Sequence, residues 1–180
     1  MIKIRKAEMS DAAGIAEVHI SSWLTTYRGI MPDEKLDSLN HESCTKKWEG
    51  NIQRSFEGKE ILLVAELAGR IVGFCGGSPN DDENTKVKYR DDLRVLYILK
   101  EFQKRGIGIK LISEYVKIIK AMNINSMIIW VLEQNDSRLF YEKLGGKIVA
   151  EKTMNFGKDL KVVGYGWENL NKIGDNNESV

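Results

Sequence analysis

A strongly apolar segment that runs directly into a glycine-containing turn and a helix constrains the fold of this chain more than any other feature. Residues 93–99 are mostly branched or aromatic and predict a buried strand, and residues 103–108 read Gln-Lys-Arg-Gly-Ile-Gly. From Ile107 to Met122, apolar side chains recur at helical spacing, which predicts a helix with one buried stripe. This order places a helix start at the end of a strand, where a ligand can reach the backbone.

The turn at residues 103–108 has the chemistry of an anion site. The first N–H groups of a helix have no partner within the helix, and the helix dipole adds partial positive charge there. The glycines leave room for a pyrophosphate to approach, and Lys104 and Arg105 add two cations. Because 27 Lys and Arg nearly balance 26 Asp and Glu, for a formal charge of +1, any affinity for anions has to be local.

Two common nucleotide-binding loops do not fit these residues. A nucleoside-triphosphate P-loop has Lys and then Ser or Thr after its last glycine, whereas Ile109 and Lys110 follow Gly108 here. The dinucleotide fingerprint has a third glycine where this chain has Leu111. Taken alone, the turn is equally compatible with an ordinary glycine turn ahead of a helix.

The rest of the chain predicts further strands and helices. We expect strands at 2–7, 60–66, 70–75, 93–99, 127–132, 148–154 and 160–166, and helices at 41–56, 107–122 and 136–144. A first helix should start at Ser10-Asp11, whose short oxygen-bearing side chains can cap it, and end near Arg28. Residues 78–92 are polar and predict a solvated loop within the domain.

This order predicts an α+β fold with an α/β-like arrangement of three layers. The central sheet is expected to be mixed and mostly antiparallel, with about seven strands and helices on both faces. A chain of 180 residues suits one domain. We place that domain at residues 1–172 and expect residues 173–180 to form a disordered polar tail.

Two motifs in the second half of the chain resemble those of the GNAT acetyltransferase superfamily. The family's cofactor motif is Gln/Arg-x-x-Gly-x-Gly/Ala after its fourth strand, and Gln103, Gly106 and Gly108 match it. Residues 4–11 and 135–145 also resemble family landmarks in order and spacing, so the likeness covers nearly the whole chain. The resemblance implies the GNAT fold, with coenzyme A in a V-shaped gap where the fourth and fifth strands splay apart.

The second motif, at residues 135–145, resembles the GNAT pattern of Asn, a small residue, then Phe-Tyr and a glycine four residues later. It departs from the pattern where Arg138 stands near the usual alanine and where Lys147 follows a second glycine. By resemblance, Tyr141 is the general acid that protonates the leaving thiolate; the alternative is a packing residue with a polar tip. Asn135 is expected to be both a helix cap and a cofactor contact.

The resemblance also implies a set of cofactor-binding residues for acetyl-CoA or CoA. They are Tyr97, Ile98, Gln103, Lys104, Arg105, Gly106, Ile107, Gly108, Ile109, Asn135, Ser137, Arg138 and Tyr141. A bulge in the fourth strand would free a backbone N–H near Tyr97 and Ile98 for the developing oxyanion. The general base is left open among Glu66, Glu133 and Tyr97.

The implied activity is transfer of an acetyl group from acetyl-CoA to a primary amine by direct attack within a ternary complex. A non-catalytic acetyl-CoA sensor on the same fold is an alternative, although a sensor would have no need for Tyr141. A transferase of longer acyl groups and an acetyltransferase of protein N-termini or lysines also remain open.

The acceptor is expected to be a small amine or polyamine. Trp23 and Tyr27 are separated by four residues, so their rings share one helical face and can hold a cation through their π faces. The acidic residues within 33–37 could attract a positive substrate, although a solvated acidic turn is the commoner meaning. We rank a protein N-terminus second and an aminoglycoside-like compound third.

Several classes of site are not expected. The two cysteines, Cys44 and Cys75, lack metal-ligand spacing and only two histidines occur, so no metal is predicted. The near-neutral charge and the lack of a basic helix argue against nucleic-acid binding. The chain has no apolar run long enough for a signal peptide or a membrane span. We therefore expect a cytoplasmic protein, either a monomer or a homodimer.

Overall fold

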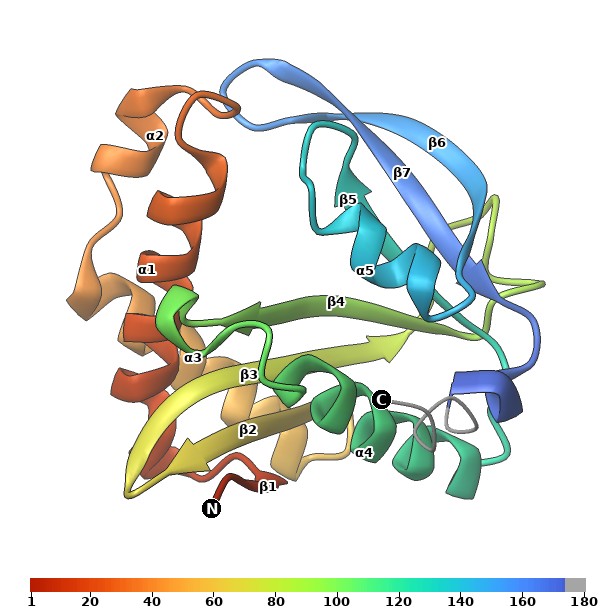
Figure 1. Cartoon of the computed structure of the whole chain (residues 1–180), viewed down its shortest axis with the longest axis horizontal. Helices are drawn as coiled ribbons and strands as arrows, with labels where there is room; N and C mark the ends of the chain where they lie inside the picture. Colours follow the sequence, from red (N-terminus) through yellow and green to blue (C-terminus); the bar gives the residue numbers. More distant parts are fainter. Residues whose placement is uncertain (174–180) are drawn as a thin grey trace.

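A mixed sheet of seven strands forms the centre of the structure, in the order β1-β2-β3-β4-β5-β7-β6 (Figure 1). The computed structural model describes residues 1–173. The strands are β1 (Lys3–Lys6), β2 (Ile61–Leu67), β3 (Arg70–Pro79), β4 (Asp91–Ile98), β5 (Met127–Leu132), β6 (Lys147–Asn155) and β7 (Asp159–Trp167). Neighbouring strands are antiparallel except for β4 and β5, which run parallel. The predicted mixed, mostly antiparallel sheet is confirmed.

Helices cover both faces of this sheet (Figure 1). They are α1 (Ala12–Tyr27), α2 (Asp33–Asp37), α3 (His41–Phe56), α4 (Ile107–Ala121) and α5 (Arg138–Lys143), with short 3₁₀ turns η1 (Met9–Asp11), η2 (Lys100–Phe102) and η3 (Leu170–Ile173). On one face, α4 buries Leu111 and Tyr115; on the other, α1 and α3 bury Ile15 and Trp48. Among the described residues, no helix is both long and apolar enough to cross a bilayer.

The first helix starts where the sequence predicted, but without the expected side-chain cap. Asp11 is the N-cap residue of α1, which begins at Ala12 after the η1 turn. The Asp11 carboxylate accepts the backbone N–H of Glu8 at 2.8 Å and pairs with the Arg5 guanidinium at 2.6 Å. Asp11 therefore ties the η1 turn to β1, and it makes no side-chain cap to α1.

The polar segment between β3 and β4 is shorter than predicted. The strand β3 continues to Pro79 and β4 begins at Asp91, so the loop covers residues 80–90 instead of 78–92. Inside the loop, the Asn80 side chain donates to the Thr85 hydroxyl at 3.0 Å and to the Tyr89 carbonyl at 2.8 Å. These bonds replace water as partners of buried polar groups, which is why such a polar sequence folds back so tightly.

The acidic turn after α1 is also more ordered than predicted, because residues 33–37 form the short helix α2. Arg28 pairs with Asp33 at 3.0 Å and with Asp37 at 2.8 Å. Two of the acidic groups proposed to attract a positive substrate are thus already paired with a cation of the chain.

The strands β4 and β5 are paired at one end and diverge towards the other. Their Cα partners are Asp91 with Met127 and Asp92 with Ile128. Further along, β5 pairs with β7 over six positions, while the edge of β4 that faces β5 continues without a strand partner in the described chain. The splayed strands implied by the resemblance are therefore present.

A buried hydrogen bond holds the closed end of this gap. The Tyr115 hydroxyl of α4 donates to the Asp91 carboxylate at 2.6 Å. A Cβ atom at Gly77 would lie 2.3 Å from the same hydroxyl, so a glycine is required on β3 at this point. Burial raises the pKa of Asp91 to about 7. The contact fixes α4, and with it the turn that precedes α4, relative to β4.

Candidate active site

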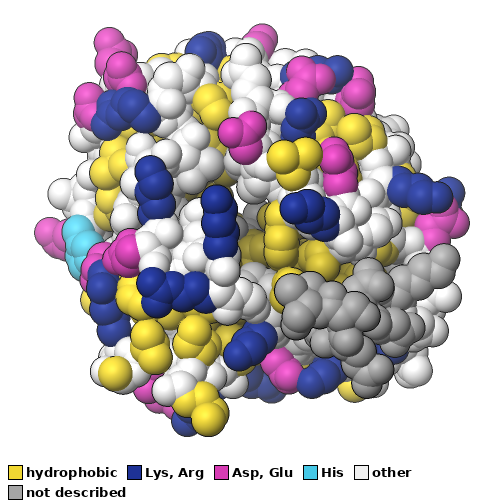
Figure 2. Space-filling view, in the orientation of Figure 1, with side chains coloured by type: hydrophobic (Ala, Val, Ile, Leu, Met, Phe, Trp, Pro, Cys, Tyr) yellow, Lys and Arg dark blue, Asp and Glu magenta, His cyan; other side chains and the backbone are white. Residues whose placement is uncertain are grey.

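A pocket of about 100 Å³ opens where β4 and β5 part. It is lined by Ser22, Thr26, Tyr27, Arg94, Val95, Leu96, Tyr97, Ile98, Gln103, Ile129, Trp130, Val131, Asn135, Ser137 and Tyr141. The face drawn in Figure 2 is hollowed near its centre, with hydrophobic side chains in the hollow and Lys and Arg side chains beside it. Segments from α1, β4, β5 and the motif after β5 thus meet at one place.

The free edge of β4 offers backbone groups to this pocket. The Leu99 N–H donates to the Val72 carbonyl of β3 at 3.0 Å. Because backbone groups alternate in direction along a strand, those of Leu96 and Ile98 point away from β3 and into the gap. An extended ligand arm can therefore add to this edge as a further strand would.

The bulge in β4 lies earlier than the resemblance suggested. The pairing of β3 with β4 shifts between Gly76 and Ser78, so that Leu93 and Arg94 together oppose Gly77. The prediction of a bulge near Tyr97 and Ile98 was thus wrong. The N–H groups near Tyr97 are freed for a different reason, which is the divergence of β5 from β4.

The turn before α4 has the backbone geometry of an anion cradle. Gly106 precedes the first helical residue with φ of +75°, and Lys104 also has a positive φ, of +59°. Successive residues in this region point their N–H groups into a common concavity. The Gln103 side chain donates to the Ile98 carbonyl at 3.0 Å, which ties the turn to the end of β4.

The two glycines of the turn have different structural roles. A Cβ at Gly106 would meet nothing within 4 Å, so this glycine is required by its positive φ. A Cβ at Gly108 would lie 3.1 Å from the Phe140 ring and 3.3 Å from the Ile98 side chain. Gly108 therefore lets α4 pack closely against α5, the helix that carries Tyr141.

The structure separates the expected cofactor residues into two groups. Tyr97, Ile98, Gln103, Asn135, Ser137 and Tyr141 line the pocket, whereas Lys104, Arg105, Gly106, Ile107, Gly108, Ile109 and Arg138 do not. The side chain of Ile107 is in the core, and that of Ile109 packs partly buried against it. Any contact from these two residues to a cofactor would have to come from their backbone. The Arg105 guanidinium lies over the Phe102 ring, 5.4 Å from its centroid.

Tyr141 is buried among aromatic rings on α5. Its ring centroid is 5.3 Å from that of Phe140, 6.1 Å from that of Tyr165 and 6.5 Å from that of Trp167. Burial, with a smaller effect from Tyr97, raises the pKa of Tyr141 well above its ordinary value. The hydroxyl is therefore protonated throughout the neutral range, as a general acid has to be.

Asn135 closes a turn just ahead of α5. Its side-chain oxygen accepts the Ser137 N–H at 2.9 Å, and its carbonyl accepts the Arg138 N–H at 3.1 Å. The expected role as helix cap was wrong, because the N-cap of α5 is Ser137 and the Asn135 bond lies before the helix. Asn135 does line the pocket, where the cofactor contact was expected.

The two aromatic residues proposed to hold the acceptor are placed differently. Tyr27 lines the pocket and is 9% exposed. Trp23 does not line the pocket; its indole N–H donates to the Tyr97 hydroxyl at 3.0 Å. The rings of Trp23 and Tyr27 meet edge to face at 5.5 Å. Trp23 thus supports the pocket wall from behind.

A buried histidine stands behind the same wall. The rings of His19 and Tyr97 are stacked, with centroids 5.7 Å apart and planes inclined by 9°. The Trp48 indole donates to His19 Nδ1 at 3.0 Å, and an indole N–H can only donate. His19 is therefore neutral with its proton on Nε2, and burial lowers its pKa to about 4.

The carboxylates suggested as general bases lie away from the pocket. Glu66 pairs with Arg5 at 2.8 Å, and Glu133 pairs with Lys161 at 2.9 Å; neither lines the pocket. Tyr97 does line it, but burial raises its pKa, so the phenolate form that could accept a proton is scarce near neutral pH.

Reading the sequence missed several pocket residues. Ser22 and Thr26 face the pocket from α1, Arg94 from β4 and Trp130 from β5. Arg94 is a single charge within the otherwise apolar residues 93–99, and Trp130 is a single aromatic residue among aliphatic ones. These two departures from the surrounding pattern were the signals in the sequence that could have identified Arg94 and Trp130 as site residues. Among residues 1–173, no group of three His, Cys, Asp or Glu side chains could hold a metal ion.

Comparisons with known proteins agree with this geometry. Residues 58–145 match the acetyltransferase (GNAT) domain. The chain is 34% identical over 174 residues to the uncharacterized N-acetyltransferase YuaI of Bacillus subtilis (strain 168), covering 96% of each protein. It is 31% identical over 150 residues to the spermidine N(1)-acetyltransferase of Thermoplasma acidophilum, covering 82% of this chain and 89% of that protein.

Among solved structures, the PaiA N-acetyltransferase of Thermoplasma acidophilum in complex with coenzyme A is similar, with a TM-score of 0.74 and 28% identity. The match covers 91% of this chain and 98% of that one. The splayed strands, the turn before α4 and relatives of this identity over nearly the full length lead to one conclusion: the chain belongs to the GNAT superfamily of acetyltransferases.

Proposed function

We propose that this GNAT acetyltransferase moves the acetyl group of acetyl-CoA to a small primary amine by direct attack within a ternary complex. The observation that carries the proposal is the buried hydroxyl of Tyr141 in a pocket formed where β4 and β5 diverge. The unpaired edge of β4 fits an extended pantetheine arm, and the turn at residues 103–108 fits a pyrophosphate.

The chain's residues have separate roles in this proposal. Acetyl-CoA, when bound, supplies the activated acetyl group and a thiolate leaving group. The backbone N–H groups of Leu96 and Ile98 point into the gap and can donate to the oxygen that gains negative charge. The Tyr141 hydroxyl can give its proton to the departing sulfur. Tyr97 and Tyr27 shape the acceptor side of the pocket.

Direct attack is favoured over a covalent acetyl-enzyme because neither cysteine suits a nucleophile. Cys75 is fully buried, and burial raises the pKa of its thiol far above the ordinary value. Cys44 is buried on α3 beside His19, and burial raises its pKa too. Since the thiolate is the nucleophilic form, both thiols would be unreactive near neutral pH.

Two observations support a small acceptor. The pocket is narrow, at about 100 Å³, and the spermidine N(1)-acetyltransferase is among the similar proteins. A polyamine is therefore one candidate, with a protein N-terminus and an aminoglycoside-like compound as others. Charge argues against the polyamine, since no acidic side chain of the described chain lines the pocket.

A panel of amines with acetyl-CoA tests the proposal, with release of free thiol as the readout. The panel should hold alkyl amines, amino acids, polyamines, an aminoglycoside and a peptide with a free N-terminus. We expect thiol release well above the rate of acetyl-CoA hydrolysis for at least one small amine. If CoA binds but no amine accelerates release, the non-catalytic sensor becomes the better description.

A further inference from the structure

An indole N–H without a hydrogen-bond partner belongs to Trp130, a residue that lines the pocket. The Nε1 atom of Trp130 is buried and has no hydrogen-bond partner among residues 1–173. A Cβ built at Gly164 of β7 would touch the Cζ3 and Cε3 atoms of this ring. The Nε1 atom therefore lies on the side of the indole away from Gly164, and the residue lines the pocket. A buried donor left unpaired is costly, so this N–H would gain from a ligand oxygen as its partner.

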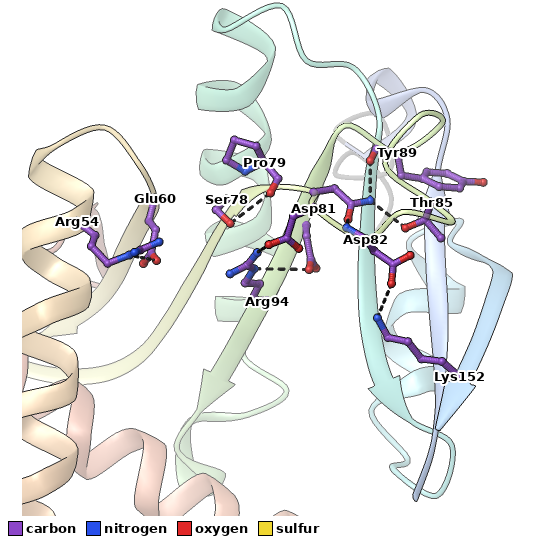
Figure 3. Close-up of polar contacts among 12 residues, drawn as sticks. Arg54, Glu60, Ser78, Pro79, Asp81, Asp82, Thr85, Tyr89, Arg94 and Lys152 are labelled. Carbon is purple, nitrogen blue, oxygen red and sulfur yellow. Dashed lines mark hydrogen bonds and ion pairs between the residues drawn. The ribbon is translucent and has the colours of Figure 1, made fainter. Parts of the chain in front are cut away.

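Arg94 of β4 lines the same pocket as Trp130. Of the side chains that line the pocket in the described chain, Arg94 alone carries a full charge. It reaches Asp81 of the loop at 3.2 Å and Asp92 at 3.6 Å (Figure 3). These two contacts use single nitrogens, Nη2 and Nε, and an arginine has five N–H donors. Arg94 therefore retains donors for a ligand.

A second ion pair holds the Trp130 ring in place. Lys152 of β6 lies 3.8 Å from the centroid of this ring and bonds to the Asp82 carboxylate at 2.7 Å (Figure 3). The loop at residues 80–90 is thus tied to β4 through Asp81 and to β6 through Asp82. Because its neighbours fix it on both sides, the indole presents its N–H in a constant direction.

We infer that the acceptor is an amine that also carries a carboxylate, as an amino acid does, and that Trp130 and Arg94 bind this carboxylate. The inference rests on the proposed acetyl transfer and names the substrate class of that site. One carboxylate oxygen would accept the orphan N–H of Trp130, and the guanidinium would supply the opposite charge. The hydroxyl of Ser22, also buried and without a partner in the described chain, belongs to a third polar residue that lines the pocket.

A polyamine would meet the opposite arrangement. Its second ammonium group would approach the Arg94 cation and would leave the Trp130 N–H unpaired, since an ammonium group has no acceptor. The charge and the orphan donor therefore both favour an amino acid over spermidine.

The test compares acceptors that differ only in the carboxylate. L-Leucine, leucinamide and isoamylamine share one side chain, and spermidine is added as the dication. Since a hydrogen bond to a charged group gives about 1.5–3 kcal/mol, we expect kcat/KM for leucine to exceed that for isoamylamine by roughly 10- to 100-fold. Equal values, or a preference for spermidine or isoamylamine, would overturn the inference while leaving acetyl transfer to amines intact.

Two variants and a matched control assign the effect to these residues. Trp130→Phe keeps an aromatic ring beneath Lys152 but replaces the indole, with its N–H, by a smaller ring without a donor, and Arg94→Gln removes the charge. In both, the ratio of kcat/KM for leucine to that for isoamylamine should fall at least about fivefold. Asp81→Asn breaks the same ion pair as Arg94→Gln but leaves the guanidinium, so it should keep the ratio. A ratio that falls equally in all three variants would mean that the loop, and not the carboxylate contact, sets the preference.

A binding measurement separates this inference from a failure of the proposed function. In the protein saturated with CoA, N-acetyl-leucine is titrated while the four indole N–H signals are followed by NMR; Trp130→Phe identifies the signal of Trp130. We expect that signal to move with N-acetyl-leucine and to stay in place with N-acetylisoamylamine. No movement at millimolar concentrations would refute carboxylate binding here, whether or not any amine is acetylated.

Discussion

At the scale of single residues, the proposed acetyl transfer depends first on the hydroxyl of Tyr141. Tyr141→Phe retains the ring and its contacts with Phe140, Tyr165 and Trp167 and removes the proton donor. We expect kcat to fall by roughly 10²- to 10⁴-fold, with CoA affinity changed by less than about threefold. Stopped assays of thiol release and calorimetric titration with CoA would measure the two quantities. Full turnover in the variant would show that solvent protonates the thiolate.

The pH profile of the reaction tests which group removes the proton from the amine. No carboxylate of the described chain lines the pocket, so we expect the amine to react after losing its proton to water. Log kcat/KM should then rise with a slope of about 1 up to the pKa of the amine. The alternative is that Asp92 acts as the general base. One of its oxygens is buried and unpartnered in the described chain, and burial raises its pKa to about 6. A plateau above pH 6 that Asp92→Asn abolishes would make Asp92 the base.

The buried histidine behind Tyr97 should make stability depend on pH. Burial lowers the pKa of His19 from 6.5 to about 4, so the unfolded chain binds its proton more readily. The contribution to stability is complete above pH 6.5 and is lost as the pH falls towards 4. Relative to His19→Asn, which can still accept the Trp48 N–H, the wild type should lose free energy of unfolding between these pH values. Urea denaturation across the range would show this; parallel curves would contradict it.

At the scale of elements, the turn before α4 can be tested with two glycines that share one backbone conformation. Gly106 and Gly58 have φ of +75° and +72°, and a Cβ at either would meet no atom within 4 Å. Alanine at each position should cost about 1–2 kcal/mol of stability because of the left-handed backbone. Only Gly106→Ala should weaken CoA binding, by several-fold in calorimetry. Equal CoA affinity in the two variants would mean that the turn does not bind the pyrophosphate.

The elements also show how much of the fold could be predicted from the sequence. The helix α4 and its turn were predictable because the glycines and the apolar stripe are local signals. The divergence of β4 from β5 was predictable only through the resemblance, since it depends on β5 pairing with β7, from Met127 with Trp167 to Leu132 with Val162, far apart along the chain. The ends of β3 and β4 were missed because Ser78, Asp91 and Asp92 are polar residues whose burial depends on partners elsewhere.

The residues of the candidate site also divide into those that the sequence predicted and those that it did not. Tyr141 and Asn135 lie in a motif and were named in advance, and the structure places both at the pocket. Trp130 and Arg94 belong to no motif, and only the packing of β7, β6 and the loop at residues 80–90 directs them into the pocket. Trp23 was expected to touch the acceptor, but its hydrogen bond to Tyr97 places it one layer behind.

At the scale of the whole molecule, two cores on opposite faces of one sheet hold the two halves of the site. The core under α4 supports the cofactor side, and the core between the sheet and the helices α1 and α3 supports Tyr97 and the acceptor side. Both substrates can therefore be held at once, from opposite sides of the gap. Under the proposed function, the amine and the thioester would then meet directly.

Initial rates measured while both substrates are varied test this claim most directly. Acetyl-CoA is varied at several fixed concentrations of the amine that the panel identifies as the best acceptor, and reciprocal rates are plotted. Direct transfer predicts lines that intersect, because both substrates must be bound before the acetyl group moves. Parallel lines, the pattern of an acetyl-enzyme formed before the amine binds, would contradict it.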